Sequence, residues 1–166
     1  RVLVVEVMGR YAGWIALHSG VAASADVILI PEIPYDMRRV VEKIAERERK
    51  GRFFSIVVIA EGAIPLGGGR TVTQSGAVGT VERLGGVGQK VSAEIEALTG
   101  KESRVVVLGH LLRGGGPTAH DRLISLRFGA AAVRALAQGR HGVMVALDPP
   151  VVKYVPLESG IRRMKT

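Results

Sequence analysis

The chain has 166 residues, 47% of which are hydrophobic, and its formal net charge is +8 at pH 7. This size and composition predict a single compact domain with a buried core. Because the sequence contains no cysteine, disulfides and thiolate metal sites are excluded, which fits a reducing compartment. No apolar run approaches the roughly 20 residues of a membrane span, and we expect a cytoplasmic protein with no membrane partner.

The positive charge has two interpretations, a nucleic-acid partner or a small anionic ligand. A basic surface attracts nucleic acid through counterion release. Here, however, lysine and arginine are scattered, and only 4% of the residues are aromatic, which leaves few platforms for base stacking. We therefore expect a small anionic substrate and no nucleic-acid partner.

The predicted elements alternate between strand and helix. Apolar runs rich in β-branched residues predict strands covered on both faces, and the segments between them have helical length. In chain order the elements are strand Val2–Val7, helix Trp14–Ala23, strand Val27–Pro31, helix Met37–Lys50, strand Phe53–Ala60, helix Val87–Thr99, strand Val105–Leu108, helix Ala119–Gln138 and strand Val143–Leu147. This order predicts an α/β fold with a parallel sheet.

Several residues mark where the predicted helices begin and end. Asp36 is expected to be an N-cap, and Asp121 is expected to begin a helix with a favourable charge. Gly51, Gly100 and Gly139 stand where helix C-terminal glycines belong. These signals support the helix boundaries independently of the apolar pattern.

One stretch interrupts the alternation of strands and helices. Residues Gly62–Gly86 are rich in Gly, Thr and Val and have no sustained helical period. They predict a long loop with room for a small hairpin. Loops of this length within compact domains are usually functional or mobile.

Charged and polar residues follow three of the predicted strands. Arg10 follows the first strand, Glu61 the third, and His110 and Arg113 the fourth. The carboxyl ends of parallel strands meet at one rim of the sheet, where ligands bind. We therefore expect these four side chains to lie close together.

This set of side chains has a chemical meaning. Two guanidinium groups and an imidazole can clamp a phosphate, whereas a carboxylate beside them would accept hydrogen bonds from hydroxyl groups. Gly9 and the run Gly114–Gly116 allow the backbone to approach a ligand. The rim thus predicts a site for a phosphorylated polyol, although each residue alone also fits a surface ion pair, a structural hydrogen bond or a turn cap.

Two further arginines lie at the opposite edge of the predicted sheet. Arg1 and Arg104 precede strands, so each lies roughly 20 Å from the rim at ~3.3 Å per residue. They are either charges facing solvent or donors to the site of a neighbouring subunit in a symmetric oligomer. The histidines show no partner pattern for a metal, and we expect no metal site in this chain.

Three segments resemble the 6-phosphofructokinases: Val5–Trp14, Ile59–Gly62, and Leu108–Thr118 followed by Asp121-Arg122. Their order and spacing agree with the family, and the similarity extends over nearly the whole chain. The resemblance implies a three-layer, Rossmann-like α/β domain of phosphofructokinase fold, comprising residues 1–166. It also implies phosphoryl transfer to the 1-hydroxyl of fructose 6-phosphate, a step of glycolysis.

The resemblance further implies roles for particular residues. The fructose 6-phosphate contacts would be Met8, Gly9, Arg10, Glu61, His110 and Arg113. Arg1 and Arg104 are similar to two arginines that reach the phosphate from an adjacent subunit, in a homodimer or homotetramer. Asp26, Lys50 and Arg52 are similar to part of an effector site, but Phe53 stands where the family has another cation.

The family's remaining parts belong to a preceding domain. They are the donor site, the Mg²⁺ ligand and the aspartate base, so we expect no catalytic residue in this chain. Arg1 leads directly into a strand without an initiator methionine, and we expect a fragment truncated at both ends and inactive alone.

The phosphate donor stays open at this point. ATP is the first choice, but the long loop resembles versions found in some pyrophosphate-dependent members. A further alternative is a non-catalytic subunit that binds a sugar phosphate as a sensor.

Overall fold

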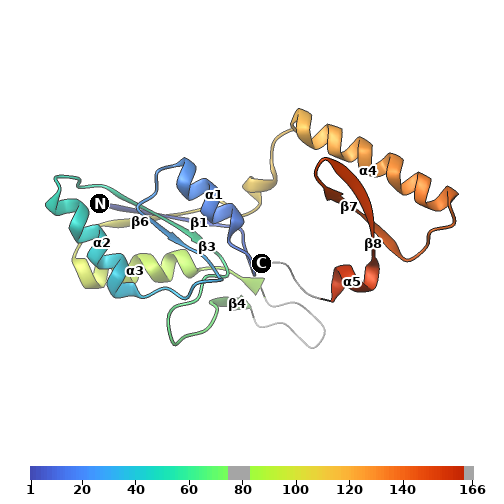
Figure 1. Cartoon of the computed structure of the whole chain (residues 1–166). Coiled ribbons are helices and arrows are strands. Elements are labelled where there is room, and N and C mark those ends of the chain that lie inside the picture. Colours follow the sequence, from blue (N-terminus) through green and yellow to red (C-terminus); the bar gives the residue numbers. More distant parts are fainter. Residues whose placement is uncertain (75–82, 163–166) are drawn as a thin grey trace. The chain divides into compact units, whose positions relative to one another are not determined.

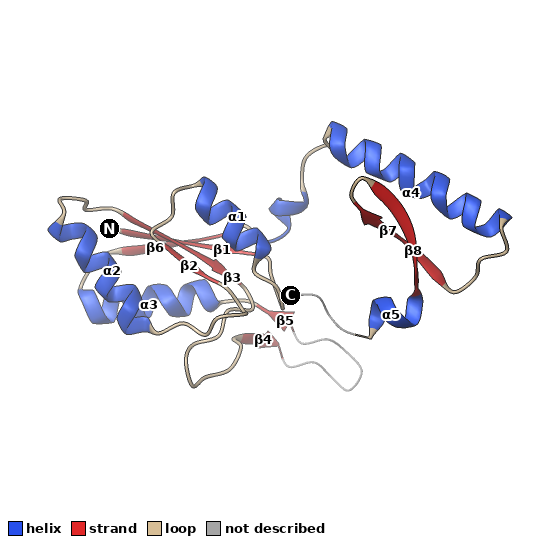
Figure 2. Cartoon of the chain, viewed as in Figure 1, coloured by secondary structure: helices blue, strands red, loops and turns tan. Residues whose placement is uncertain are grey.

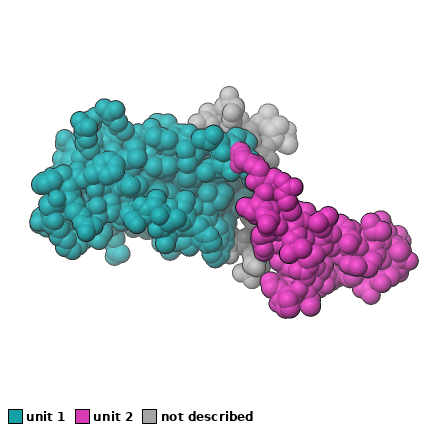
Figure 3. All heavy atoms as spheres, turned by 90° about the horizontal axis from the view of Figure 1, so that it is seen from above, with its two compact units in different colours: residues 1–113, 166 teal, residues 114–165 magenta. Residues whose placement is uncertain are grey.

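The computed structural model describes residues 1–74 and 83–162. The chain forms two compact units, residues 1–113 and a second unit that begins at Gly114 (Figure 3). The first unit contains β1 (Val2–Val7), α1 (Trp14–Ala22), β2 (Val27–Leu29), α2 (Met37–Arg49), β3 (Ser55–Ala60), β4 (Val72–Gln74), β5 (Arg83–Leu84), α3 (Val87–Thr99), β6 (Ser103–Val107) and the 3₁₀ helix η1 (Gly109–Arg113). Whether all 166 residues act as one domain stays a prediction.

The first unit is built on a four-stranded parallel sheet of order β2-β3-β1-β6 (Figure 2). Val7 pairs with Ala60, and Glu6 pairs with Val107. Because of this register, β1, β3 and β6 all end at the same rim. The predicted parallel sheet is confirmed for these strands, and the predicted helices begin and end within one residue of the observed ones.

Helices cover both faces of this sheet, with α1 on one face and α2 and α3 on the other (Figure 1). Alternate residues of the strands point to opposite faces. Val4 and Val57 belong to the core under α2 and α3, whereas Val58 and Ala60 pack with Ala16 of α1. The three-layer α/β arrangement that the family resemblance implied is thereby confirmed for the first unit.

The predicted helix-end signals are also confirmed. The Asp36 carboxylate accepts a hydrogen bond from the Arg38 amide at 2.9 Å, which caps α2. Gly100, at the end of α3, has φ +65°, a left-handed conformation that favours glycine. These local interactions explain why the helix boundaries could be predicted.

The predicted long loop at residues 62–86 contains a small antiparallel hairpin of β4 and β5. Val72 pairs with Leu84, and Leu84 is buried. Residues 75–82 lie outside the described part of the chain. The hairpin brings the chain back to the sheet just before α3 begins.

The second unit contains α4 (Ala119–Ala137), β7 (Val143–Asp148), β8 (Val151–Pro156) and α5 (Leu157–Ile161). Thr118 and Asp121 form a reciprocal capping box at the start of α4, as the sequence indicated for Asp121. The Tyr154 hydroxyl donates to the carbonyl of Ala131 at 2.8 Å and so connects β8 to α4.

One strand prediction is wrong. The run Val143–Leu147 was expected in the parallel sheet, but it pairs antiparallel with β8. The two strands are joined through Pro149-Pro150, so their pairing needs closure of only a very short loop. A continuous apolar run predicts a strand but does not identify its partner. No helix in the described residues is long and apolar enough to cross a membrane.

Candidate functional site

A pocket of about 470 Å³ lies at the rim where β1, β3 and β6 end. Four of the predicted contacts, Met8, Arg10, Glu61 and His110, line this pocket together. The lining residues are Glu6, Val7, Met8, Arg10, Glu61, Leu84, Gly85, Gly86, Gln89, Val107, Gly109 and His110. The pocket therefore combines the guanidinium of Arg10 and the imidazole of His110 with two carboxylates and the neutral amide of Gln89.

Backbone hydrogen bonds interlock the loops that follow β1 and β3. The Glu61 amide donates to the Val7 carbonyl at 2.9 Å, and the Gly62 amide donates to the Gly9 carbonyl at 3.0 Å. In return, the Gly9 amide points to Oε1 of Glu61 at 3.4 Å. These contacts hold the Glu61 carboxylate beside the loop that carries Arg10.

Two glycines are required for this close approach. Gly9 has φ +147°, and a Cβ added there would lie 2.8 Å from the Ala12 carbonyl oxygen. A Cβ added to Gly62 would overlap the carbonyl of Arg10 and lie 2.8 Å from the carbonyl oxygen of Gly9. The backbone, rather than any side chain, thus determines how near the two loops come.

The loop that carries Arg10 is also anchored at its far end. Gly13 is the N-cap of α1 and has no side chain to cap the helix. Its amide donates to both carboxylate oxygens of Glu32, at 2.9 and 3.1 Å. Glu32 lies 19 positions from Gly13 in the chain, so its capping role depends on the tertiary structure.

His110 and Arg113 belong to η1, and both are exposed. In a 3₁₀ helix, side chains three residues apart lie on the same side. Leu112, between them, packs against the core under α1 and holds η1 against the sheet. His110 lines the pocket, whereas Arg113 and Gly9 are not among the lining residues.

The sequence did not single out the wall formed by Leu84–Gln89, nor the buried carboxylate of Glu6. A charged residue within an apolar strand was the available signal for Glu6. The double glycine Gly85-Gly86 at the end of the long loop was the signal for the wall. Neither signal says that the two segments meet.

Arg1 and Arg104 lie at the edge of the sheet opposite to the rim, as predicted. Arg1 precedes β1, whereas Arg104 lies within β6, where it pairs with Leu3, so Arg104 is nearer to the rim than the roughly 20 Å predicted. Glu102 lies between them, 3.0 Å from Arg1 and 2.8 Å from Arg104. The hydrogen bond from Arg104, followed by the charge of Arg1, lowers the pKa of Glu102.

Two of the three residues predicted as an effector site, Asp26 and Lys50, already have side-chain partners within the unit. The buried Asp26 carboxylate forms an ion pair with Arg47 and accepts from the Ile56 amide at 2.9 Å. Lys50 pairs with Glu46, and its hydrogen bond is the main cause that lowers the pKa of Glu46 to about 2. Asp26 thus stabilises the start of β3, and an effector site here stays a prediction.

The described residues contain no group of three or more His, Cys, Asp or Glu side chains that could hold a metal ion.

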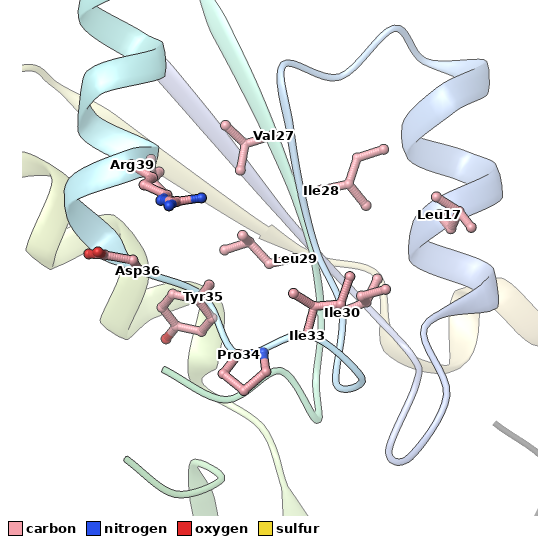
Figure 4. A pocket seen from close by; sticks show the side chains of 11 residues that line it. Leu17, Val27, Ile28, Leu29, Ile30, Ile33, Pro34, Tyr35, Asp36 and Arg39 are labelled. Atoms are coloured by element: carbon pink, nitrogen blue, oxygen red, sulfur yellow. The ribbon is translucent and has the colours of Figure 1, made fainter. Parts of the chain in front are cut away.

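A second pocket, of about 370 Å³, lies along β2, which is an edge strand of the sheet (Figure 4). Its walls are mainly apolar, with Leu17, Ile28, Ile30 and Ile33 among them. None of the predicted sugar-phosphate contacts lines it. An apolar lining does not suit a phosphate, so the rim pocket is the candidate site.

Comparison with known proteins shows which family the chain is similar to. The family model described as Phosphofructokinase matches residues 1–136. The chain is 56% identical over 157 residues to an ATP-dependent 6-phosphofructokinase of Chloroflexus aurantiacus, covering 95% of this chain and 42% of that protein. Over an alignment of 168 positions it is 50% identical to a pyrophosphate–fructose 6-phosphate 1-phosphotransferase of Amycolatopsis methanolica, covering 100% of this chain and 49% of that protein.

A solved structure of phosphofructokinase from Saccharomyces cerevisiae superposes with a TM-score of 0.79 at 28% identity, covering 98% of this chain and 20% of that one. The chain spans about half the length of the curated relatives it matches. The three comparisons and the rim pocket lead to one conclusion: the chain belongs to the phosphofructokinase family.

Proposed function

We propose that this chain provides the fructose 6-phosphate site of a 6-phosphofructokinase. The enzyme would transfer a phosphoryl group to the 1-hydroxyl and form fructose 1,6-bisphosphate. The observation that carries the proposal is the convergence of Met8, Arg10, Glu61 and His110 on one pocket, from three separate strand ends. These are contacts that the family resemblance implies from the sequence alone.

The charges in the pocket give the sugar phosphate an orientation. His110 and Arg113, on one side of η1, would bind the 6-phosphate through charge-assisted hydrogen bonds. The Glu61 carboxylate repels a phosphate and would accept from sugar hydroxyls, with Gly9 beside it. Arg10 would contact the sugar end and stabilise negative charge there. The chain contributes positioning and charge to the transfer.

Arg1 and Arg104 would act on the site of an adjacent subunit. Arg1 lies six residues before Val7, the last residue of β1, which is roughly 20 Å at ~3.3 Å per residue, and Arg104 lies three residues before Val107, the last residue of β6, which is roughly 10 Å. Side chains project to the faces of a sheet rather than along its strands, so neither arginine reaches its own rim. A symmetric homodimer or homotetramer would present them reciprocally.

The donor is proposed to be ATP, because the matched relative with 56% identity carries that name. Pyrophosphate is the alternative, since a relative with 50% identity is named for it. The donor and Mg²⁺ would bind mainly to residues outside this chain. Mixing the chain with a separately produced donor-binding half should restore turnover, and rates with ATP and with pyrophosphate would then identify the donor. Absence of turnover despite binding would favour the sensor alternative.

Calorimetric titration of fructose 6-phosphate tests the site itself. Arg113→Ala and Glu61→Ala should each lose about 2 kcal/mol or more of binding free energy, as expected for a charge-assisted hydrogen bond. The exposed α2 variants Arg49→Ala and Glu42→Ala remove the same charges away from the pocket and should bind like the parent. If both site variants bind fructose 6-phosphate as tightly as the parent, neither Arg113 nor Glu61 belongs to the site. Arg104→Ala should weaken binding only in the intact oligomer.

A further inference from the structure

The rim pocket has a wall that the family resemblance did not supply. This wall is the segment Leu84–Gln89, where the hairpin ends and α3 begins. Gly86 is the N-cap of α3, with φ +81°, and Gln89 is the third residue of the helix. Gln89 is exposed and lines the same pocket as Arg10, Glu61 and His110. Among the described residues that line the pocket, Gln89 is the one with a neutral amide side chain.

Glu6 connects this wall to the sheet. It lies on β1 and shares the face of Val4, toward α3. Its side chain is only 3% exposed, and Oε2 accepts the Gly88 amide proton at 2.7 Å, although the two residues are 82 positions apart. Gly86 has no side chain to cap α3, so Glu6 satisfies one of the unpaired amides at the start of the helix.

The contact suits a carboxylate for two reasons. The start of a helix carries partial positive charge, which stabilises a nearby anion. Gly88 also leaves room for the carboxylate, since a Cβ there would lie 2.9 Å from Glu6 Oε2 and 3.1 Å from Val105. As a result, the start of α3 is tied to the strand that leads to Met8 and Arg10.

We infer that Gln89 is a further contact for a sugar hydroxyl and that Glu6 is the positioning residue that holds Gln89 in the pocket. This inference rests on the proposed function. A neutral amide both donates and accepts hydrogen bonds, as a hydroxyl does. In the proposed site the cationic side chains bind the phosphate and the Glu61 carboxylate accepts from sugar hydroxyls. An uncharged amide adds specificity for the hydroxyls.

Titration of the full chain with fructose 6-phosphate and with inorganic phosphate separates the two kinds of contact. Gln89→Ala should weaken fructose 6-phosphate binding about two- to tenfold, the effect of one neutral hydrogen bond, and leave phosphate binding unchanged. Gln138→Ala removes the same side chain from an exposed position of the second unit and should have no effect. If Gln89→Ala leaves sugar-phosphate binding unchanged, or weakens both ligands equally, Gln89 is not a hydroxyl contact.

Variants of Glu6 test the positioning role. Glu6→Gln keeps an oxygen that can accept from Gly88 and should retain most of the affinity, whereas Glu6→Ala should lose as much as Gln89→Ala. In the double variant of Glu6→Ala and Gln89→Ala the two losses should not add. Amide hydrogen exchange should show faster exchange at Gly88 in Glu6→Ala only. Gly88→Ala, which displaces the contact without altering the carboxylate, gives a second measurement if Glu6→Ala does not fold.

The outcomes distinguish this inference from the proposed function. If the parent chain does not bind fructose 6-phosphate, both are refuted. If Arg113→Ala and Glu61→Ala weaken binding while Gln89→Ala and Gly88→Ala do not, the proposed function stands and this inference is refuted. If Glu6→Gln loses as much affinity as Glu6→Ala, Glu6 does not act through the Gly88 amide.

Discussion

Gly62→Ala should damage the site without touching the ligand. Gly62 is buried between the loops that follow β1 and β3. An added Cβ would overlap the carbonyl of Arg10, with the carbonyl carbon at 2.6 Å and the carbonyl oxygen of Gly9 at 2.8 Å. Both distances are shorter than Cβ contacts in real proteins, and backbone atoms cannot rotate away as a flexible side chain can. The two loops must therefore separate.

The cost has two parts that the structure identifies. Overpacking of a tight interior typically costs about 1–3 kcal/mol. Separation also breaks the hydrogen bond from the Gly62 amide to the Gly9 carbonyl, which contributes about 1 kcal/mol. We expect Gly62→Ala to lower the free energy of unfolding by about 2–4 kcal/mol. Because Glu61 moves away from Gly9, fructose 6-phosphate affinity should fall at least about tenfold.

Urea denaturation and calorimetric titration measure the two effects on the same protein. Gly69→Ala is the matched control, because it lies in the same loop and a Cβ there meets nothing within 4 Å. It should change the free energy of unfolding by less than about 0.5 kcal/mol. Parent-like stability and affinity in Gly62→Ala would refute the claim that backbone approach of the two loops forms the site.

Three other predictions concern stability. Asp26→Ala leaves Arg47 without its ion-pair partner and should lower the free energy of unfolding by about 2 kcal/mol or more. Asp148→Ala breaks an exposed ion pair and should lower it by under about 1 kcal/mol. Equal urea midpoints of the two variants would contradict this difference. Burial, followed by the charge of Glu94, raises the pKa of Tyr35 from 10.0 to about 12. Because the folded chain keeps the Tyr35 hydroxyl protonated to higher pH than the unfolded chain does, the contribution of Tyr35 to stability is complete below pH 10 and is lost as pH rises toward 12. A tyrosinate absorbance titration should show one tyrosine that ionises at higher pH than the others, and Tyr35→Phe should remove this component. If the component persists in Tyr35→Phe, it belongs to another tyrosine. Thr118→Ala removes the cap of α4 and should cost about 1 kcal/mol, measured by thermal unfolding; an unchanged midpoint would mean that the capping box does not stabilise the helix.

Much of the site could be predicted because parallel strands obey a simple rule. Arg10, Glu61 and His110 each follow an apolar run, and the carboxyl ends of parallel strands share one rim. The observed register of β1 with β3 and β6 brings these residues to one pocket. Helix ends were equally predictable, since Asp36 and Gly100 act through contacts a few residues away in the chain.

The sequence by itself determined most of the strands and helices, though not β8 or α5, and it determined which side chains reach the rim, because both follow from local periodicity and from the direction of the chain. Only the tertiary structure decided which distant residues meet. Glu6 reaches the Gly88 amide across 82 positions, Glu32 reaches Gly13, and β7 pairs with β8 rather than with the parallel sheet. These contacts depend on where whole elements pack in space, and an apolar strand or a capping carboxylate fits many partners until packing selects one.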